Sequence, residues 1–296
     1  MTLELKNINK SFGAKHVLKG VSFSAEGGKA FGLLGRNGAG KTTSIRILMD
    51  VFGADSGEVL FDGKKIDYSK VGIGYLPEER GLYPKKIIID QLTYFAELKG
   101  LCKKDAVSSV DYWLSRLGMS EYRNKKLDTL SKGNQQKIQL VTALAHDPQI
   151  VILDEPFSGL DPVNARLLKD IVKEVIEKGK IVLFSSHQMN YIEEFCDSIA
   201  ILNSGQVDLC GDLRDIKRNY PRTRLEIRTE APEIIRERFG DRCSDGTQGS
   251  LIIKMDSPED KKRTMEEIIS CCDVDEVKVF EPSLNDIFVE YTKDGI

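Results

Sequence analysis

The chain has 296 residues, a length that accommodates one large domain or two ordinary ones. Lys and Arg total 43 and Asp and Glu total 46, so the net charge of −3 argues against a protein that mainly binds nucleic acid through a basic face. With 41% hydrophobic and 30% charged residues, the composition is that of a folded globular protein and not of a disordered chain.

Neither a membrane span nor an export signal is expected from the sequence. The best apolar runs, such as residues 30–34 and 150–153, have the length of single strands, and the first residues lack a basic segment followed by an apolar one. The six cysteines are scattered without a CxxC pair, so we expect reduced thiols and no zinc site.

The first 63 residues predict strands around one helix. Residues 1–30 predict short strands that end at a glycine turn, and the apolar run 30–34 predicts a strand buried on both faces. After a glycine-rich turn at 35–40, apolar residues at helical spacing predict a helix that runs through Phe52 and ends at the following glycine. Residues 57–63 then predict a strand that closes in an Asp-Gly turn.

The periodicity is helical from about residue 84 to residue 145, which we interpret as a helical subdomain. The pattern predicts a first helix with Asp90 as its N-cap and a second helix that ends at Gly118. A third helix is predicted to begin at the N-cap Ser131 and to stop before Pro148.

Strand patterns return at 150–153 and 181–184. Between them the sequence predicts a helix with Asp161 as N-cap and Pro162 in its first turn. Strands that alternate with helices in this way predict an α/β fold, with a parallel sheet covered on both faces.

The composition changes after Tyr220-Pro221. From there, apolar strands alternate with charged amphipathic helices up to about residue 291. We therefore expect a larger domain over residues 1–220 and a small α+β domain over residues 221–296, the latter in βαββαβ order.

Residues 35–42 fit the pattern G-x-x-x-x-G-K-[ST] between the predicted buried strand and a helix, which predicts a phosphate-binding loop. Glycines let successive backbone N–H groups point inward at a helix N-terminus, where an anion is stabilised. Lys41 adds a positive charge for the β- and γ-phosphates, and the hydroxyl of Thr42 is a ligand for Mg²⁺. The alternative, a glycine-rich turn with a solvated lysine, fits this strand–helix context less well.

Asp154 and Glu155 end the second apolar strand, at the edge where parallel sheets bind ligands. We expect Asp154 to hold the Mg²⁺ shell and Glu155 to polarise the attacking water. Two carboxylates after a strand are by themselves also typical of a polar loop, and it is the upstream phosphate loop that favours a catalytic role.

Together these motifs resemble the nucleotide-binding subunits of ABC transporters over about residues 3–215. Four segments match motifs of that family in the family's order, namely Walker A, the LSGGQ signature, Walker B and the D-loop, at residues 35–43, 130–136, 150–155 and 158–161. Phe12 lies where the family has an aromatic residue that stacks on adenine, and His187 matches the family's switch histidine.

The resemblance implies an ATPase of the P-loop NTPase, ABC-type fold whose nucleotide is held between two subunits. The implied catalytic residues are Glu155, His187 and Lys41, and the implied Mg²⁺ ligands are Thr42, Glu78 and Asp154. The residues implied to bind nucleotide are Phe12, Gly35, Asn37, Gly38, Ala39, Gly40, Lys41, Thr42, Thr43, Ser131, Gly133, Asn134 and Asp161. Ser131 and the Gly133 backbone would act on the nucleotide of the other subunit.

Two departures from the family pattern stand out. Lys132 and Asn134 replace a Gly and a Gln of the signature, and Glu78 stands where the family usually has a Gln that contacts Mg²⁺. A carboxylate oxygen still ligates magnesium, so Glu78 remains a predicted metal ligand. With the ending at 281–290, these variants resemble the ATP-binding subunits of ABC-2-type exporters, including the sodium-extrusion type.

The resemblance therefore implies an ATP- and Mg²⁺-dependent subunit that forms a homodimer or heterodimer. It would dock on a separate ABC-2-type membrane permease at the cytoplasmic face of the membrane, as a peripheral protein without a nucleic-acid partner. Two alternatives stay open: a soluble ABC ATPase that acts on nucleic acid or ribosomes, and a nucleotide-switch regulator. The first fits less well because the chain carries a single cassette and no basic stripe.

Overall fold

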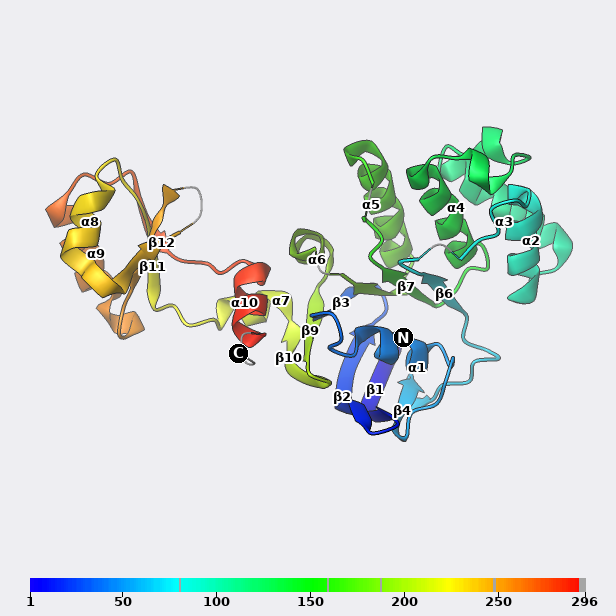
Figure 1. Cartoon of the computed structure of the whole chain (residues 1–296), viewed down its shortest axis with the longest axis horizontal. Helices are drawn as coiled ribbons and strands as arrows, with labels where there is room; N and C mark the ends of the chain where they lie inside the picture. Colours follow the sequence, from blue (N-terminus) through cyan, green and yellow to red (C-terminus); the bar gives the residue numbers. More distant parts are fainter. Residues whose placement is uncertain (80, 159, 187, 247–248, 293–296) are drawn as a thin grey trace. The chain divides into compact units, whose positions relative to one another are not determined.

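The structure is a computed structural model, and it describes residues 1–79, 81–158, 160–186, 188–246 and 249–292. The chain divides into two compact units (Figure 1). The larger unit contains Met1–Leu213 and the segment that begins at Phe288, and the smaller unit is Arg214–Ile287.

A six-stranded sheet in the order β10-β9-β3-β8-β7-β6 is the centre of the larger unit. Five of its strands are parallel, and only β10 runs antiparallel to its neighbour. The strands are β3 (Ala30–Gly35), β6 (Ile73–Leu76), β7 (Ile150–Asp154), β8 (Ile181–Ser185), β9 (Ser198–Asn203) and β10 (Gln206–Asp212). Every residue of β3, β7 and β8 is buried, as the apolar runs 30–34, 150–153 and 181–184 predict, because both faces of the sheet are covered.

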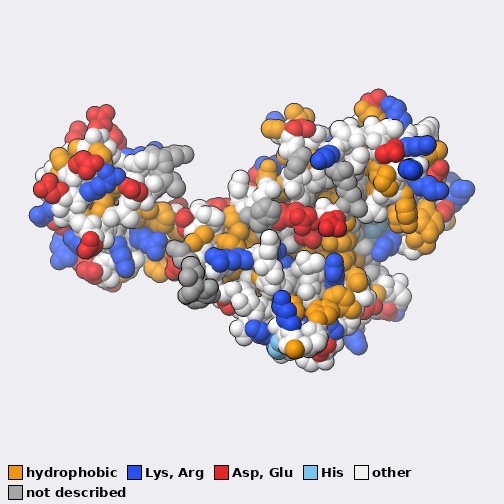
Figure 2. All heavy atoms as spheres, in the orientation of Figure 1, with side chains coloured by type: hydrophobic (Ala, Val, Ile, Leu, Met, Phe, Trp, Pro, Cys, Tyr) orange, Lys and Arg blue, Asp and Glu red, His pale blue; other side chains and the backbone are white. Residues whose placement is uncertain are grey.

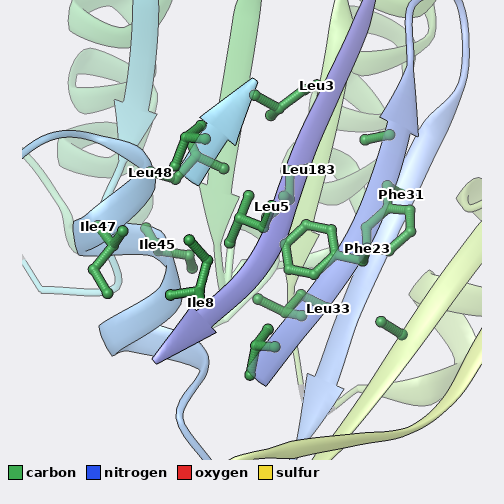
Figure 3. Close-up of a cluster of buried hydrophobic side chains, with 14 of the residues drawn as sticks. Leu3, Leu5, Ile8, Phe23, Phe31, Leu33, Ile45, Ile47, Leu48 and Leu183 are labelled. Atoms are coloured by element: carbon green, nitrogen blue, oxygen red, sulfur yellow. The ribbon is translucent and has the colours of Figure 1, made fainter. Parts of the chain in front are cut away.

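A second, antiparallel sheet and helix α1 cover one face of the six-stranded sheet (Figure 1). The sheet has the order β2-β1-β4-β5, and its strands are Thr2–Phe12 (β1), Lys15–Glu26 (β2), Ser56–Phe61 (β4) and Lys64–Lys65 (β5). Figure 3 shows part of the core between these layers, with side chains from both sheets and from α1. This core positions α1, and with it the phosphate loop that precedes the helix.

Helix α1 (Lys41–Leu48) is shorter than the apolar spacing predicted. Asp50 adopts a left-handed backbone with φ of 58°, and the N–H of Val51 donates to the carbonyl of Arg46 at 2.9 Å. The prediction that the helix runs through Phe52 was therefore wrong, because the chain leaves helical geometry at Asp50.

Helices α4 (Lys132–Leu144) and α5 (Pro162–Glu177) cover the opposite face of the sheet (Figure 1). On β7, Ile152 joins the core against the second sheet, whereas Val151 and Leu153 lie against residues of α4 and α5. Residues 150–153 of the strand are all apolar because their side chains alternate between these two cores.

Helix α2 (Ile88–Leu98) begins without the predicted side-chain cap. The backbone N–H groups of Ile88 and Ile89 donate to carbonyl groups in the 123–125 loop, each at 3.0 Å. The loop thus satisfies donors that a capping side chain would otherwise satisfy, so the prediction that Asp90 is the N-cap was wrong. Asp90 lies in the first turn instead.

The larger unit contains several further helical elements. They are α3 (Lys103–Arg116), α6 (Met189–Phe195), the start of α7 (Leu213–Arg218), and the 3-10 turns Ser120–Tyr122 and Leu127–Thr129. The second predicted helix is confirmed as α3, and Gly118 follows its end with φ of 66°.

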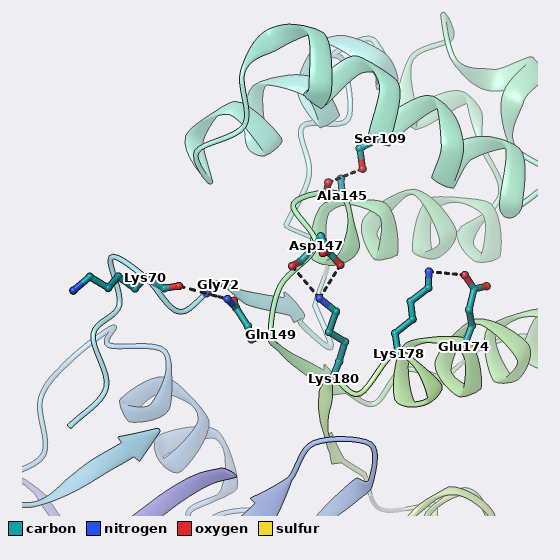
Figure 4. A network of polar contacts seen from close by, with 9 residues as sticks. All are labelled: Lys70, Gly72, Ser109, Ala145, Asp147, Gln149, Glu174, Lys178 and Lys180. Atoms are coloured by element: carbon teal, nitrogen blue, oxygen red, sulfur yellow. Dashed lines mark hydrogen bonds and ion pairs between the residues drawn. The ribbon is translucent and has the colours of Figure 1, made fainter. Parts of the chain in front are cut away.

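Polar contacts fix the amino ends of β7 and β8, which are the ends away from Asp154 (Figure 4). Lys180, just before β8, forms an ion pair with Asp147 at 2.8 Å. Gln149, just before β7, accepts a hydrogen bond from the N–H of Gly72 at 2.6 Å. These contacts fix the amino ends of the two strands. The opposite, carboxyl ends are the edge at which parallel sheets bind ligands.

The smaller unit contains the predicted βαββαβ order, with its four strands paired as β12-β13-β11-β14. The elements are β11 (Arg224–Arg228), α8 (Pro232–Phe239), β12 (Cys243–Asp245), β13 (Leu251–Lys254), α9 (Lys261–Cys271) and β14 (Glu276–Val279), with 3-10 turns at Gly240–Arg242 and Pro258–Asp260. Its own apolar core is centred on Leu225, Ile227 and Ile253. Helix α10 (Leu284–Tyr291) follows and crosses the division between the units at Phe288.

The surface carries charges of both signs. Figure 2 shows acidic and basic side chains interspersed on the face of the molecule that it presents, without a continuous basic stripe there. Within the described ranges, no helix combines the length and the apolar character needed to cross a bilayer.

Candidate functional site

A cavity of about 770 Å³ in the larger unit brings the predicted phosphate loop and both carboxylates together. This volume lies within the range of pockets that hold small molecules and cofactors. The lining residues are Phe12, Lys15, Val17, Gly35, Arg36, Asn37, Gly38, Gly40, Lys41, Thr42, Thr43, Glu78, Asp154, Glu155 and Phe288. All of them belong to the larger unit, and most are residues that the sequence predicted for the site.

The phosphate loop connects β3 to the N-terminus of α1. Gly38 and Gly40 have φ of 82° and 115°, values that residues with a Cβ rarely adopt. A Cβ at Gly40 would also lie 2.6 Å from the side chain of Leu18. The left-handed backbone therefore favours glycine at Gly40, and the loop leads into a helix N-terminus whose backbone N–H groups attract an anion.

The ammonium of Lys41 lies inside this loop. It donates to the carbonyl of Gly35 at 2.6 Å and to that of Arg36 at 3.4 Å. Burial lowers the pKa of Lys41, and the nearby carboxylates of Glu155 and Asp154 act in the opposite direction. The loop therefore presents a cation together with backbone donors, a combination that fits a phosphate chain.

Asp154 lies at the carboxyl end of β7, with 8% of its surface exposed. Burial raises its pKa, while hydrogen bonds from the hydroxyls of Ser185 and Tyr75 lower it; the Tyr75 bond measures 3.3 Å. Ser185 comes from β8 and Tyr75 from β6, so strands on both sides of β7 orient this carboxylate. Neither neighbour was among the predicted site residues.

Glu155 is 6% exposed and has a left-handed backbone with φ of 48°. The hydroxyl of Ser186 donates to Oε2 of Glu155 at 2.8 Å, and the N–H of Glu155 donates to the carbonyl of Ser185, also at 2.8 Å. A glutamate in this conformation costs about 1–3 kcal/mol and persists only where its surroundings hold it. The residues after β8 therefore keep the Glu155 side chain in a defined position at the cavity wall.

The cavity offers oxygen ligands of the kind that magnesium requires. Thr42, Glu78 and Asp154 all line it, and Glu78 is exposed. Among the described residues, no group of three or more His, Cys, Asp and Glu is close enough to hold a metal by itself. This donor set fits Mg²⁺, which proteins bind through one or two carboxylates while substrate phosphates supply further oxygens.

Phe12 forms an exposed aromatic edge of the cavity. Its side chain is 49% exposed, and its ring meets that of Phe52 edge to face at a centroid distance of 5.4 Å. The ammonium of Lys10 lies 5.6 Å from both ring centroids. Phe12 is thus held on one side and leaves the rest of its surface available for a flat ligand.

The structure does not bring the predicted signature and D-loop residues into this cavity: Ser131, Gly133, Asn134 and Asp161 do not line it. Ser131 is the N-cap of α4, as predicted, and its hydroxyl accepts from the N–H of Asn134 at 3.4 Å. Asp161 is the N-cap of α5, as predicted, and accepts from the N–H groups of Val163 and Asn164 at 3.0 and 2.9 Å.

Two glutamines of α4 contact the loops of the cavity, which sequence patterns did not indicate. The side-chain amide of Gln136 donates to the carbonyl of Pro156 at 2.7 Å. That of Gln139 donates to the carbonyl of Glu79 at 3.0 Å. The helix that begins at the signature is thereby bonded to the chain beside both Glu155 and Glu78.

Of the remaining predicted residues, Ala39 does not line the cavity. Ala39 is buried, and its carbonyl accepts from the N–H of Gly205 at 3.1 Å, so it supports the phosphate loop from behind. His187 lies outside the described residues. Conversely, Lys15, Val17 and Phe288 line the cavity although the sequence did not point to them. For Phe288, the only signal was its place in the segment 281–290 that the family resemblance singled out.

Two family models match the chain. Residues 18–158 match the model described as ABC transporter. Residues 211–292 match the model described as ATP-binding protein DrrA1-3-like, C-terminal domain.

Similar proteins agree with these matches. An uncharacterized ABC transporter ATP-binding protein of Alkalihalophilus pseudofirmus is 44% identical over 87% of this chain and 97% of its own length. The linearmycin resistance ATP-binding protein LnrL of Bacillus subtilis is 35% identical over 72% of this chain and 70% of its own length. A solved structure described as the ATP binding subunit of an ABC transporter superposes with a TM-score of 0.69 at 30% identity, covering 74% of this chain and 93% of that chain.

Proposed function

This chain belongs to the ABC transporter ATP-binding proteins and carries a DrrA-like C-terminal domain, and on that premise we propose which residues perform its ATPase reaction. It is an ATP-binding, ATP-hydrolysing subunit of the exporter group of these transporters. The single observation that carries the assignment of residues is the cavity itself, in which the phosphate loop faces Asp154 and Glu155.

We assign the phosphate chain to residues 35–43 and the base to Phe12. Asn37, Gly38 and Gly40 shape the loop, while Lys41 and the first turn of α1 neutralise the phosphate charge. Thr42, Glu78 and Asp154 would hold Mg²⁺, which neutralises charge on the β- and γ-phosphates when bound. The buried position of Asp154 supports this role, because a cation would offset the cost of the buried charge.

Glu155 is the proposed general base. Its carboxylate accepts a hydrogen bond from Ser186 and lines the cavity beside Asp154. A positioned carboxylate orients a water for in-line attack and accepts its proton. His187, which lies outside the described residues, is proposed to contact the γ-phosphate.

Ser131, Gly133, Asn134 and Asp161 are proposed to act across a dimer. They lie outside the cavity of their own copy, and Ser131 stands exposed at the N-terminus of α4. A hydroxyl and N–H groups at a helix N-terminus stabilise an anion, so the γ-phosphate bound by a second copy is their proposed ligand. ABC ATPases dimerise, and this arrangement would make ATP part of the dimer interface.

ABC ATPases also pair with a permease, which we propose here to be of the ABC-2 type and to hold the chain at the cytoplasmic face of the membrane. The proposed contact is an apolar groove of about 280 Å³ beside α2, lined by Ile73, Tyr75, Pro77, Gly81, Leu82, Phe95, Leu98, Lys99, Gln139, Thr142 and His146. Leu98, which lines the groove, is 64% exposed, and Tyr94 on the same helix is 52% exposed. An exposed apolar groove of this kind marks a protein contact.

The domain boundaries that we propose are those predicted from the sequence. Residues 1–220 form the ATP-binding domain, with 84–145 as its helical subdomain, and residues 221–296 form an accessory domain. A nucleic-acid partner is not proposed, because the net charge is −3. The name of LnrL, a resistance protein, supports an export direction for this chain.

The experiment that tests these assignments is Glu155→Gln. The exchange keeps the shape of the side chain and its contact with Ser186 but removes the basic carboxylate. ATP affinity should therefore stay within about twofold, while turnover falls by about 10²–10⁴-fold. The variant should also accumulate as an ATP-bound dimer, measured by light scattering.

The matched control is Glu79→Gln, which removes an exposed carboxylate that does not line the cavity. Its turnover should equal that of the unchanged protein. Rapid hydrolysis by the Glu155→Gln variant would contradict the assignment of the base, and loss of ATP binding would show that Glu155 is needed for the shape of the site.

A further inference from the structure

Phe288 lines the nucleotide cavity although it stands near the other end of the sequence from Phe12. It lies on α10, where Leu284 and Ile287 are fully buried. Because successive helical residues point about 100° apart, Phe288 projects from a different side of the helix than Ile287. Its side chain is half-buried, and the residue belongs to the larger unit, as the rest of the cavity does.

A chain of contacts ties the end of α10 to the phosphate loop. The side-chain amide of Asn203 donates to the carbonyl of Tyr291 at 3.4 Å. Asn203 ends β9, and the turn that follows contains Gly205, whose N–H donates to the carbonyl of Ala39 at 3.1 Å. A Cβ at Gly205 would lie 2.2 Å from the carbonyl of Val17, so this turn lies directly against β2. These contacts hold the helix that carries Phe288 beside Val17 and the phosphate loop.

The lining of the cavity divides by chemistry. The charged and glycine residues that line it are those of the phosphate loop, Lys15 and the three carboxylates, whereas the large apolar side chains are Phe12, Val17 and Phe288. A nucleotide has the same division between a charged phosphate chain and a flat base with apolar faces. The two aromatic rings are therefore the surfaces on which a base would stack.

We propose that Phe288 is a second base-binding residue, which contacts the purine of bound ATP together with Phe12. This inference rests on the proposed function of the cavity and extends it, because it draws the C-terminal segment into the nucleotide site.

The test compares two ligands on the full-length chain: ATP, and inorganic tripolyphosphate, which lacks the base. The Phe288→Ala variant should bind ATP about tenfold more weakly, the loss expected for one base–aromatic contact, and should bind tripolyphosphate as the unchanged protein does. Phe288→Tyr, which keeps the ring, should restore the ATP affinity. Both dissociation constants are measured by isothermal titration calorimetry.

The matched control is Tyr291→Ala, which removes an aromatic side chain from the same helix that does not line the cavity. Its affinities should equal those of the unchanged protein. Equal ATP affinity in Phe288→Ala would overturn the inference, and so would equal loss of both ligands, since that indicates a structural role. If the unchanged protein binds neither ligand, the proposed function itself fails, whatever the Phe288 variants do.

Discussion

The carboxylate of Asp154 is buried beside Glu155, and burial raises its pKa because a charged group loses hydration there. A pKa raised by folding means that ionisation favours the unfolded state. The cost is absent below the ordinary value of 3.8 and grows as the pH rises through the folded-state value. At neutral pH, which lies above that ordinary value, the raised pKa therefore lowers the stability of the nucleotide-free protein at a position where its function requires a carboxylate.

Replacing Asp154 with Asn should consequently stabilise the nucleotide-free protein at pH 7. Since a carboxamide keeps the size of the side chain and can accept from Tyr75, the unfolding midpoint should rise by about 2–4 °C. The same variant should lose ATP hydrolysis, because the proposed metal ligand is weakened. Thermal unfolding monitored by circular dichroism measures the first effect.

The pH dependence separates this cause from a packing effect. The gain from Asp154→Asn should shrink as the pH is lowered from 7 toward the ordinary carboxyl range, because the unchanged protein then also carries a neutral side chain. A gain that has not decreased when the pH reaches the ordinary carboxyl value of 3.8, or a loss of stability at pH 7, would contradict the burial argument.

At the scale of single elements, α4 connects several parts of the site. Its N-cap is Ser131, and two glutamines along it donate to backbone carbonyls beside Glu155 and Glu78. A helix is rigid over this length, so a ligand at Ser131 is mechanically linked to both loops. The element thus joins the proposed contact with a second subunit to the catalytic residues.

The Ser131→Ala variant tests that link. Loss of the hydroxyl should lower ATP turnover by about 100-fold, as expected when one donor to the transferring phosphoryl group is removed, and leave the ATP affinity of the monomer unchanged. The stability cost should be only about 0.5–1 kcal/mol, because the capping bond of 3.4 Å is long. Steady-state phosphate release and calorimetry provide the two measurements.

Thr129→Ala is the control, since it removes an exposed hydroxyl two residues before Ser131 that donates only to the carbonyl of Lys126. Its turnover should be unchanged and its stability within about 0.5 kcal/mol of the starting protein. A Ser131→Ala variant that loses affinity and turnover in equal measure would show that the serine serves its own subunit's nucleotide.

The N-termini of three helices show which features local sequence patterns can predict. Ser131 and Asp161 were predicted as caps and are caps, because each side chain bonds N–H groups only two or three residues ahead. Asp90 was predicted in the same way and is not a cap, because a loop 33 or more residues later in the chain supplies carbonyl partners at 123–125. Tertiary contacts with this loop therefore take the place of a local side-chain cap.

At the scale of the whole molecule, the proposed partner is a membrane protein seated in the apolar groove beside α2. Leu98→Glu places a charge in that groove at a side chain that is 64% exposed. Recovery of the permease with the tagged subunit from detergent extracts should fall by about tenfold or more, while ATP affinity is unchanged.

Val51→Glu is the control, because Val51 is exposed to a similar degree, 62%, and does not line the groove. It should recover the permease normally. Equal recovery with Leu98→Glu would contradict the groove as the contact. Recovery of RNA or ribosomes in place of a membrane protein would instead support the alternative of an ABC ATPase without a transport role.

The sequence by itself determined the α/β fold of the larger unit, the βαββαβ order of the smaller one, and the motifs that the cavity gathers. These features depend on residues close together in the chain: the phosphate loop joins one strand to the next helix, and Asp154 and Glu155 end a single strand. Local spacing and residue type are sufficient for such predictions, because backbone geometry links neighbours directly.

Only the tertiary structure decided which distant residues complete the site. Tyr75 and Ser185 bond to Asp154 because β6 and β8 flank β7 in the sheet. The order of the strands along the chain does not predict which strands are neighbours in the sheet. Phe288 lines the cavity, and the helix that carries it accepts a hydrogen bond from Asn203 at the end of β9. Contacts of this kind depend on which strands pair and on where a terminal helix docks. Both are determined by packing over the whole unit.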